Sequence, residues 1–308
     1  MKISKLNLFI KLLFNIFLIC SLPTHAMKFG VEEKNGISDY CNWRLSGEIL
    51  PKDADNAAKI FKNRLNKCNQ SMDWKAGKAS VYLNSNGGDL GAAYVIGRLL
   101  RAYEVHTKID KNSKCFSACV FIYLAGVERT IYPPFNQLGI HRPYFSDLGT
   151  ELSLTDIKTI RARQLDTLKV YLNEMDIPLT LADVMMSIPP DSIKILEYEE
   201  FKVFRLNGTD ASFEEKENAI LAGRYQLSSG DYRRLYAQAI ERCDIGKRFY
   251  SPLSEEDREQ SACKEAILWR LSLTKYKQRE ISFSNQCLVE PFDHDQIFKC
   301  ARKIFLAP

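Results

Sequence analysis

Three short segments of this chain carry residues that could do chemistry, and the first holds a pair of glycines. It runs from Leu83 to Asp89 and ends a short apolar stretch with Gly87 and Gly88. Paired glycines after a strand form a tight turn whose exposed N–H groups favour negative charge, either a phosphate or an oxyanion. Asp110 lies near the spacing of a ribose-binding acid, but the GxGxxG pattern of dinucleotide sites lacks its first glycine here. A plain turn is the remaining alternative, and the glycines alone do not decide.

The other two segments supply a serine and a histidine. Residues 115–119 (CFSAC) place Ser117 just before an apolar run. A serine at a loop-to-helix junction can present its hydroxyl beside free backbone N–H groups, and the Ala118 amide could then stabilise an oxyanion. Residues 138–143 place His141 at the end of a short apolar stretch that a proline stops. Taken singly, a helix-capping serine and a structural histidine explain these residues better.

Hydrophobic periodicity predicts the elements that position these segments. Strands are expected at 81–83, 105–109, 130–132 and 138–140, and helices at 90–103, 118–125 and 153–175. Ser153 and Asp156 have the spacing of a capping box. This alternation predicts an α/β domain with parallel crossovers over residues 27–206. Residues 207–308 predict a separate helical module, with helices at 212–242, 254–279 and 294–305 and four cysteines.

The N-terminal residues 1–26 have the pattern of a cleavable signal peptide. A start with three lysines and no acid precedes an apolar run at 12–20 and a small-residue end at Ala26. An uncleaved anchor is the alternative; with cleavage we expect a periplasmic or secreted protein without a membrane span. Cleavage leaves 308 − 26 = 282 residues with a net charge of 40 − 38 = +2. A nearly neutral protein gives no electrostatic reason to expect a nucleic-acid partner.

Eight cysteines remain after cleavage, and an even number in an exported chain indicates disulfides. A zinc site is a weak alternative, because the chain has no CxxC motif. Cys115 and Cys119 could form a local disulfide or stay as buried thiols. For the others we expect neighbours in sequence to pair: Cys41 with Cys68, Cys243 with Cys263, and Cys287 with Cys300.

Together, the three segments resemble the proteolytic subunit of the Clp protease and its relatives in the crotonase-like superfamily. The strand-end LNSPGG of that family looks like residues 83–88, and its IHQP looks like residues 140–143. The family's nucleophilic serine is followed nine residues later by glycine, as Ser117 is by Gly126, and the separation 141 − 117 = 24 is close to that of the family. The resemblance covers about residues 78–206. Within the superfamily, the chain looks more specifically like an exported, periplasmic branch. The resemblance implies a spiral core of repeated ββα units. The helical, disulfide-tied C-terminal module predicted above would be an addition to that core.

The resemblance also implies roles for individual residues. Ser117 would be the nucleophile and His141 the general base, with an oxyanion hole from the backbone amides of Gly87, Gly88 and Ala118. Asp183 best matches the acid that orients the histidine, and Asp191 is the reserve candidate. Residues 180–183 match a capping box equally well, so a structural role for Asp183 stays open.

The function that this resemblance implies is a serine peptidase acting on unfolded chains or short peptides, without a cofactor. An exported chain has no ATP supply, so action under an ATP-driven unfoldase is not expected. A homo-oligomer is compatible with the resemblance. Two departures, Asn86 for the family's proline and the bulky Phe116 before the serine, leave an alternative open: a weakly active or inactive peptide-binding protein of the cell envelope.

Overall fold

The computed structural model describes residues 26–34, 37–70, 79–143, 153–245, 255–288 and 294–307. The predicted signal peptide lies outside these residues except for Ala26. The chain divides into two compact units between Asp210 and Ala211. Each unit is described by itself below.

The first unit is built on a mixed six-stranded sheet with the strand order β1-β2-β3-β4-β6-β9. The four central strands run parallel, and both edge strands are antiparallel to their neighbours. The α/β class is therefore confirmed, whereas the edge strands were not predicted. The strands are β1 (Lys28–Lys34), β2 (Ile37–Ser46), β3 (Ser80–Asn84), β4 (His106–Ile109), β6 (Glu128–Ile131) and β9 (Gly208–Thr209).

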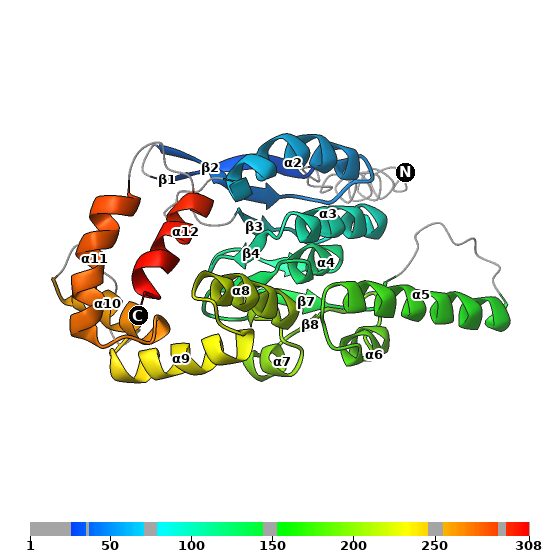
Figure 1. Cartoon of the computed structure of the whole chain (residues 1–308). Coiled ribbons are helices and arrows are strands. Elements are labelled where there is room, and N and C mark those ends of the chain that lie inside the picture. The colour runs from blue at the N-terminus through cyan, green and yellow to red at the C-terminus, as the bar shows by residue number, and fades with distance from the viewer. Residues whose placement is uncertain are drawn as a thin grey trace, which may run out of the picture. The chain divides into compact units, whose positions relative to one another are not determined.

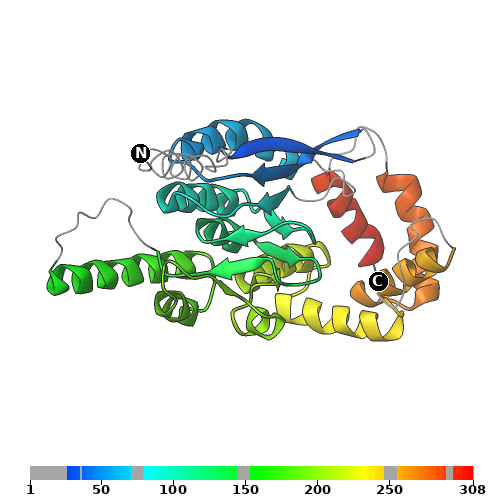
Figure 2. The ribbon, with the colours of Figure 1, turned by 180° about the vertical axis from the view of Figure 1, so that it is seen from behind.

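Three helices, α2 (Asp53–Gln70), α3 (Leu90–Ala102) and α4 (Ala118–Leu124), lie one above another beside these strands (Figures 1 and 2). Every residue of α4 is buried, as the apolar run at 118–125 predicts. A helix that is apolar all round belongs in a core. Because α4 cannot shift without disturbing that core, the residue at its N-terminus is held on a rigid element.

A smaller sheet supports the candidate site. It has the order β5-β7-β8, with β5 (Cys115–Phe116) parallel to β7 (Leu138–Ile140) and β7 antiparallel to β8 (Lys194–Ile195). Around it lie α5 (Leu154–Glu174), α6 (Thr180–Ser187) and α7 (Tyr198–Val203). The capping box at the start of α5 is confirmed, since the Ser153 and Asp156 side chains each accept from the other's backbone N–H.

The second unit is helical and contains two of the predicted disulfides. Its described helices are α8 (Ala211–Arg224), α9 (Ser229–Arg242), α10 (Glu255–Leu268), α11 (Leu273–Cys287) and α12 (His294–Phe305). The single helices predicted at 212–242 and 254–279 are wrong, because each is broken in the middle. Gln226 and Arg270 adopt positive φ angles at the breaks, and Ser228 and Ser272 then cap new helices.

The disulfides Cys243–Cys263 and Cys287–Cys300 confirm two predicted pairs, and Cys115 and Cys119 are also joined. Cys41 is disulfide-bonded, while the side chain of Cys68 lies outside the described residues. No helix in the described part of the chain combines the length and apolar character that a membrane span needs.

Candidate active site

Backbone pairing brings the three chemistry-bearing segments side by side. The Ser85 N–H donates to the Lys114 carbonyl at 2.7 Å, and the Phe116 N–H donates to the Ser85 carbonyl at 3.0 Å. The glycine segment therefore runs along β5, whose other neighbour is β7. Residue 117 follows β5 directly, and residue 141 follows β7. Because these parallel strands end at the same edge, the serine and the histidine emerge together.

Ser117 and His141 form a hydrogen bond of 2.6 Å between Oγ and Nε2. The His141 Nδ1 atom lies 2.9 Å from the backbone carbonyl oxygen of Arg142. A carbonyl can only accept, so Nδ1 carries the proton, and in the neutral ring Nε2 accepts the Ser117 hydroxyl. Ser117 stands at the N-cap position of α4 but makes no side-chain capping bond. The Ser117 hydroxyl is therefore hydrogen-bonded to His141 and does not cap α4.

Two backbone amides are available for an oxyanion. Among the described residues, nothing accepts a hydrogen bond from the N–H of Gly88 or of Ala118. The third candidate differs, because the Gly87 N–H already donates to Ser85 Oγ at 3.1 Å. Of the three amides expected to form an oxyanion hole, those of Gly88 and Ala118 therefore remain as candidate donors. This is a physical consequence of the tight turn, in which a side-chain oxygen two residues earlier satisfies the amide.

Glycine is required at both positions of the pair. A Cβ atom at Gly87 would lie 2.7 Å from the Ser117 Cβ, and one at Gly88 would lie 2.2 Å from the Ile49 carbonyl oxygen. Both residues also have positive φ angles, of 106° and 136°. The close approach of the turn to the serine is thus possible only without side chains. Asp89 then caps α3 by accepting from the Ala92 N–H at 2.6 Å.

In the described part of the chain, neither Asp183 nor Asp191 is hydrogen-bonded or ion-paired to His141. The Asp183 carboxylate lies 3.1 Å from Lys169 Nζ, and its side chain is 57% exposed. Asp183 is on α6, which packs against α5, and α5 supplies that lysine. Asp191 accepts a long hydrogen bond of 3.5 Å from Ser192 Oγ. The described hydrogen-bond partner of His141 Nδ1 is the Arg142 carbonyl, which no sequence signal could single out.

A cavity of about 380 Å³ begins beside both halves of the site. Leu90 follows the glycine turn by two residues, and Pro143 follows His141 by two residues. The other walls come from α3 and α5, and Gln164 Nε2 holds the Pro143 carbonyl at 3.1 Å. The sequence analysis missed this cavity, although its α5 residues share one face at helical spacing. The lining residues are Leu90, Gly91, Tyr94, Pro143, Ile160, Arg163, Gln164 and Thr167.

Comparison with known proteins gives only slight likenesses. No protein-family model matches the chain, and no curated protein matches it. Among solved structures, the chain is similar to a mutant of ClpP1 from Listeria monocytogenes, with 17% identity and a TM-score of 0.40 over 55% of this chain and 90% of that one. It is also similar to a mutant of the membrane-bound stomatin-specific protease 1510-N, with 16% identity and a TM-score of 0.38 over 57% of this chain and 82% of that one. At these scores we draw nothing about activity from either structure.

Proposed function

We propose that this chain is a serine peptidase that hydrolyses unfolded or short peptides with Ser117 as nucleophile and His141 as general base. The observation that carries the proposal is the 2.6 Å contact between Ser117 Oγ and His141 Nε2, beside two available amides. A serine hydroxyl becomes nucleophilic only with an adjacent base, and this pairing meets that requirement. The disulfides support the periplasmic or secreted location expected from the N-terminus, because such bonds persist in oxidising compartments.

The proposed reaction follows from the placement of the donors and acceptors. His141 Nε2 takes the hydroxyl proton as Ser117 Oγ attacks the peptide carbonyl carbon. The carbonyl oxygen becomes an oxyanion that accepts from the Gly88 and Ala118 amides. His141 then gives its proton to the leaving amine as the C–N bond breaks, which leaves an acyl group on Ser117. Water then attacks the ester carbon while the same imidazole takes a proton from it. As the bond to Ser117 Oγ breaks, His141 returns that proton to Oγ, and the carboxylic acid product leaves.

Covalent labelling tests the proposal. A fluorophosphonate probe should phosphonylate the wild-type protein, and mass spectrometry of the digest should find the adduct on Ser117. No adduct on a folded wild-type protein, or an adduct on another serine, would contradict the proposal. Peptide binding without turnover, unchanged in Ser117→Ala, would instead support the peptide-binding alternative.

The contacts of Asp183 predict that this residue contributes little to turnover. In Asp183→Asn we expect kcat/KM to stay within about threefold of the wild-type value, because the Asp183 carboxylate pairs with Lys169 and its side chain is 57% exposed. Loss of an orienting acid in a Ser-His-Asp triad costs about 10⁴-fold in kcat. Steady-state hydrolysis of a fluorogenic peptide measures the difference. Asp191→Asn is the matched comparison, and a loss of about 10³-fold or more in either variant would identify that aspartate as the orienting acid.

The cavity beside the site predicts a preference for large apolar side chains next to the scissile bond. Its walls are largely apolar, as in most sites that bury a ligand side chain. Thr167→Trp would fill part of the space from the exposed rim. We expect kcat/KM for a peptide with phenylalanine beside the scissile bond to fall about tenfold or more, and that for the alanine analogue to change by less than about threefold.

Thr159→Trp provides the matched control for the cavity. Thr159 and Thr167 are both exposed on α5, and each donates its hydroxyl to the carbonyl four residues earlier at 2.9 Å. Thr159 does not line the cavity. If both tryptophan variants lower phenylalanine-peptide hydrolysis equally, the effect belongs to the helix and not to the cavity.

A further inference from the structure

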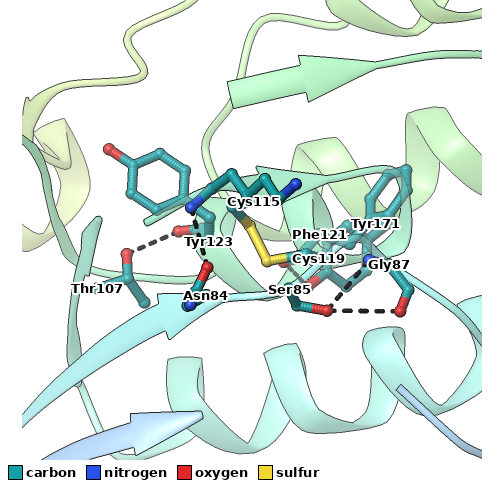
Figure 3. The surroundings of a disulfide bond; sticks show 10 residues. Asn84, Ser85, Gly87, Thr107, Cys115, Cys119, Phe121, Tyr123 and Tyr171 are labelled. Carbon is teal, nitrogen blue, oxygen red and sulfur yellow. Dashed lines mark hydrogen bonds between the residues drawn. A yellow bond between two sulfur atoms is a disulfide. The ribbon is translucent and has the colours of Figure 1, made fainter. Parts of the chain in front are cut away.

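The candidate nucleophile lies in the middle of a disulfide-closed loop. Cys115 belongs to β5 and Cys119 belongs to α4, so the bond between them ties strand to helix across Ser117. Both cysteines are fully buried. Figure 3 shows the bond beside Ser85 and Gly87, the residues that make the glycine turn. The disulfide therefore encloses the candidate nucleophile and lies beside the turn that would supply an amide of the oxyanion hole.

Ser117 has a backbone conformation that a serine adopts only when its surroundings impose it. Its φ angle is 55° and its ψ angle is −126°, in a region that L side chains rarely occupy. On one side the Ser117 N–H donates to the Gly139 carbonyl at 2.9 Å. On the other side the fully buried α4 begins at Ala118. Relaxation of φ to a negative value would carry the Ser117 hydroxyl away from His141 and would turn the Ala118 amide at the same time.

We propose that the Cys115–Cys119 disulfide is a positioning element for catalysis, which makes the reactive geometry of Ser117 and of the Ala118 amide depend on the oxidised state of these two cysteines. The inference rests on the proposed peptidase function and adds redox control to it. Conversion to the reduced form takes two electrons and two protons. A dithiol supplies them, becomes a cyclic disulfide itself, and leaves two cysteine thiols; a disulfide oxidant reverses the exchange.

The Cys115–Cys119 disulfide is expected to add little to the free energy of unfolding. The entropy that a disulfide removes from the unfolded chain grows with the length of the loop it closes. Cys115 and Cys119 are 4 residues apart, whereas Cys243 and Cys263 are 20 residues apart. Among the described disulfides, the one around Ser117 therefore gains the least entropic stabilisation. The Cys243–Cys263 bond, in the second unit, is the matched control.

The test compares two paired replacements, Cys115→Ala with Cys119→Ala, and Cys243→Ala with Cys263→Ala, in the full chain. We expect the first pair to lower kcat by about 10- to 100-fold with KM within about twofold, because a small displacement of a nucleophile lowers the rate of the chemical step. Its rate of phosphonylation by a fluorophosphonate should fall by a similar factor. The control pair should lower the melting temperature more than the first pair and leave kcat within about twofold of the wild-type value.

Three results would overturn the inference. Equal phosphonylation rates and equal kcat in the first pair and the wild type would show that the bond does not position Ser117. Equal losses of kcat in both pairs would show a general effect of stability. If the wild type is not labelled at all, the proposed peptidase function falls and takes this inference with it, whereas the first two results leave that function standing. Should the first pair fail to fold, Cys119→Ser, which nearly preserves the buried volume, gives the same readouts.

Discussion

In Ser117→Ala, kcat/KM for peptide hydrolysis should fall by at least about 10³-fold, with the fold and melting temperature nearly unchanged. The Ser117 hydroxyl is hydrogen-bonded to His141 and makes no capping bond to α4. Its removal therefore takes away the nucleophile without taking away a helix cap. A residual rate from the oxyanion hole and from substrate binding sets the floor.

His141→Ala should give a loss of similar size, and the double variant should be no worse than either single one. Residues that act as one unit show such non-additive losses, since removing either member already disables the other. Ser228→Ala is the control serine, because Ser228 caps α9 in the second unit. It should lose about 1 kcal/mol of stability and keep its activity. Turnover that survives in Ser117→Ala would overturn the assignment of the nucleophile.

Local sequence patterns were sufficient to predict the elements that carry the site. The helix at 90–103, the buried helix at 118–125 and the strand at 138–140 each have a periodicity or an apolar run within one segment. The structure confirms all three as α3, α4 and β7. The antiparallel edge strands could not be predicted in the same way, because pairing is decided between distant segments. β9, for example, is only two residues long.

The site itself was predictable as a set of segments but not as a set of contacts. Spacing and resemblance brought Ser117 and His141 together as candidates. They could not show that Gly87 donates its N–H to Ser85, that Asp183 pairs with Lys169, or that the Arg142 carbonyl contacts His141 Nδ1. Those contacts depend on the backbone direction in a turn and on how α6 packs against α5. A short window of sequence determines neither the backbone direction in a turn nor the packing of one helix against another.

A buried cluster of charges in the first unit, made by Arg129, Asp210 and Arg101, could not be predicted from the sequence either. Arg129 stands on β6 with 1% of its surface exposed, although its neighbours in sequence give no sign of burial. Its Nη1 donates to the carbonyls of Leu124 and Gly126 at 3.2 and 2.8 Å. The fully buried carboxylate of Asp210 lies 3.9 Å from that nitrogen, and accepts from Arg101 Nη2 at 2.7 Å. Burial lowers the pKa of Arg129, and the charge of Asp210 opposes that shift.

Asp210→Ala should therefore destabilise the protein strongly, by about 3–5 kcal/mol. The variant would leave the Arg129 guanidinium buried without its counter-charge and would leave Arg101 beside it, so that two like charges repel. For a unit of this size such a loss lowers the melting temperature by about 10 °C. Thermal and urea unfolding followed by circular dichroism measure the effect. Peptide hydrolysis below the melting transition should be little changed, because Asp210 binds the two arginines and takes no part in the Ser117–His141 hydrogen bond.

Glu174→Ala is the matched control, because it removes another arginine–carboxylate pair from the same unit. Arg98 and Glu174 lie 2.7 Å apart, but their side chains are 46% and 38% exposed. Solvent screens an exposed pair, so the expected loss is at most about 1 kcal/mol. Asp210→Asn separates charge from shape, since the amide keeps an acceptor for Arg101 but no counter-charge for Arg129. If Asp210→Asn loses nearly as much unfolding free energy as Asp210→Ala, the buried charge matters more than the hydrogen bond. If both variants lose no more than Glu174→Ala, the buried cluster is no more important than a surface ion pair.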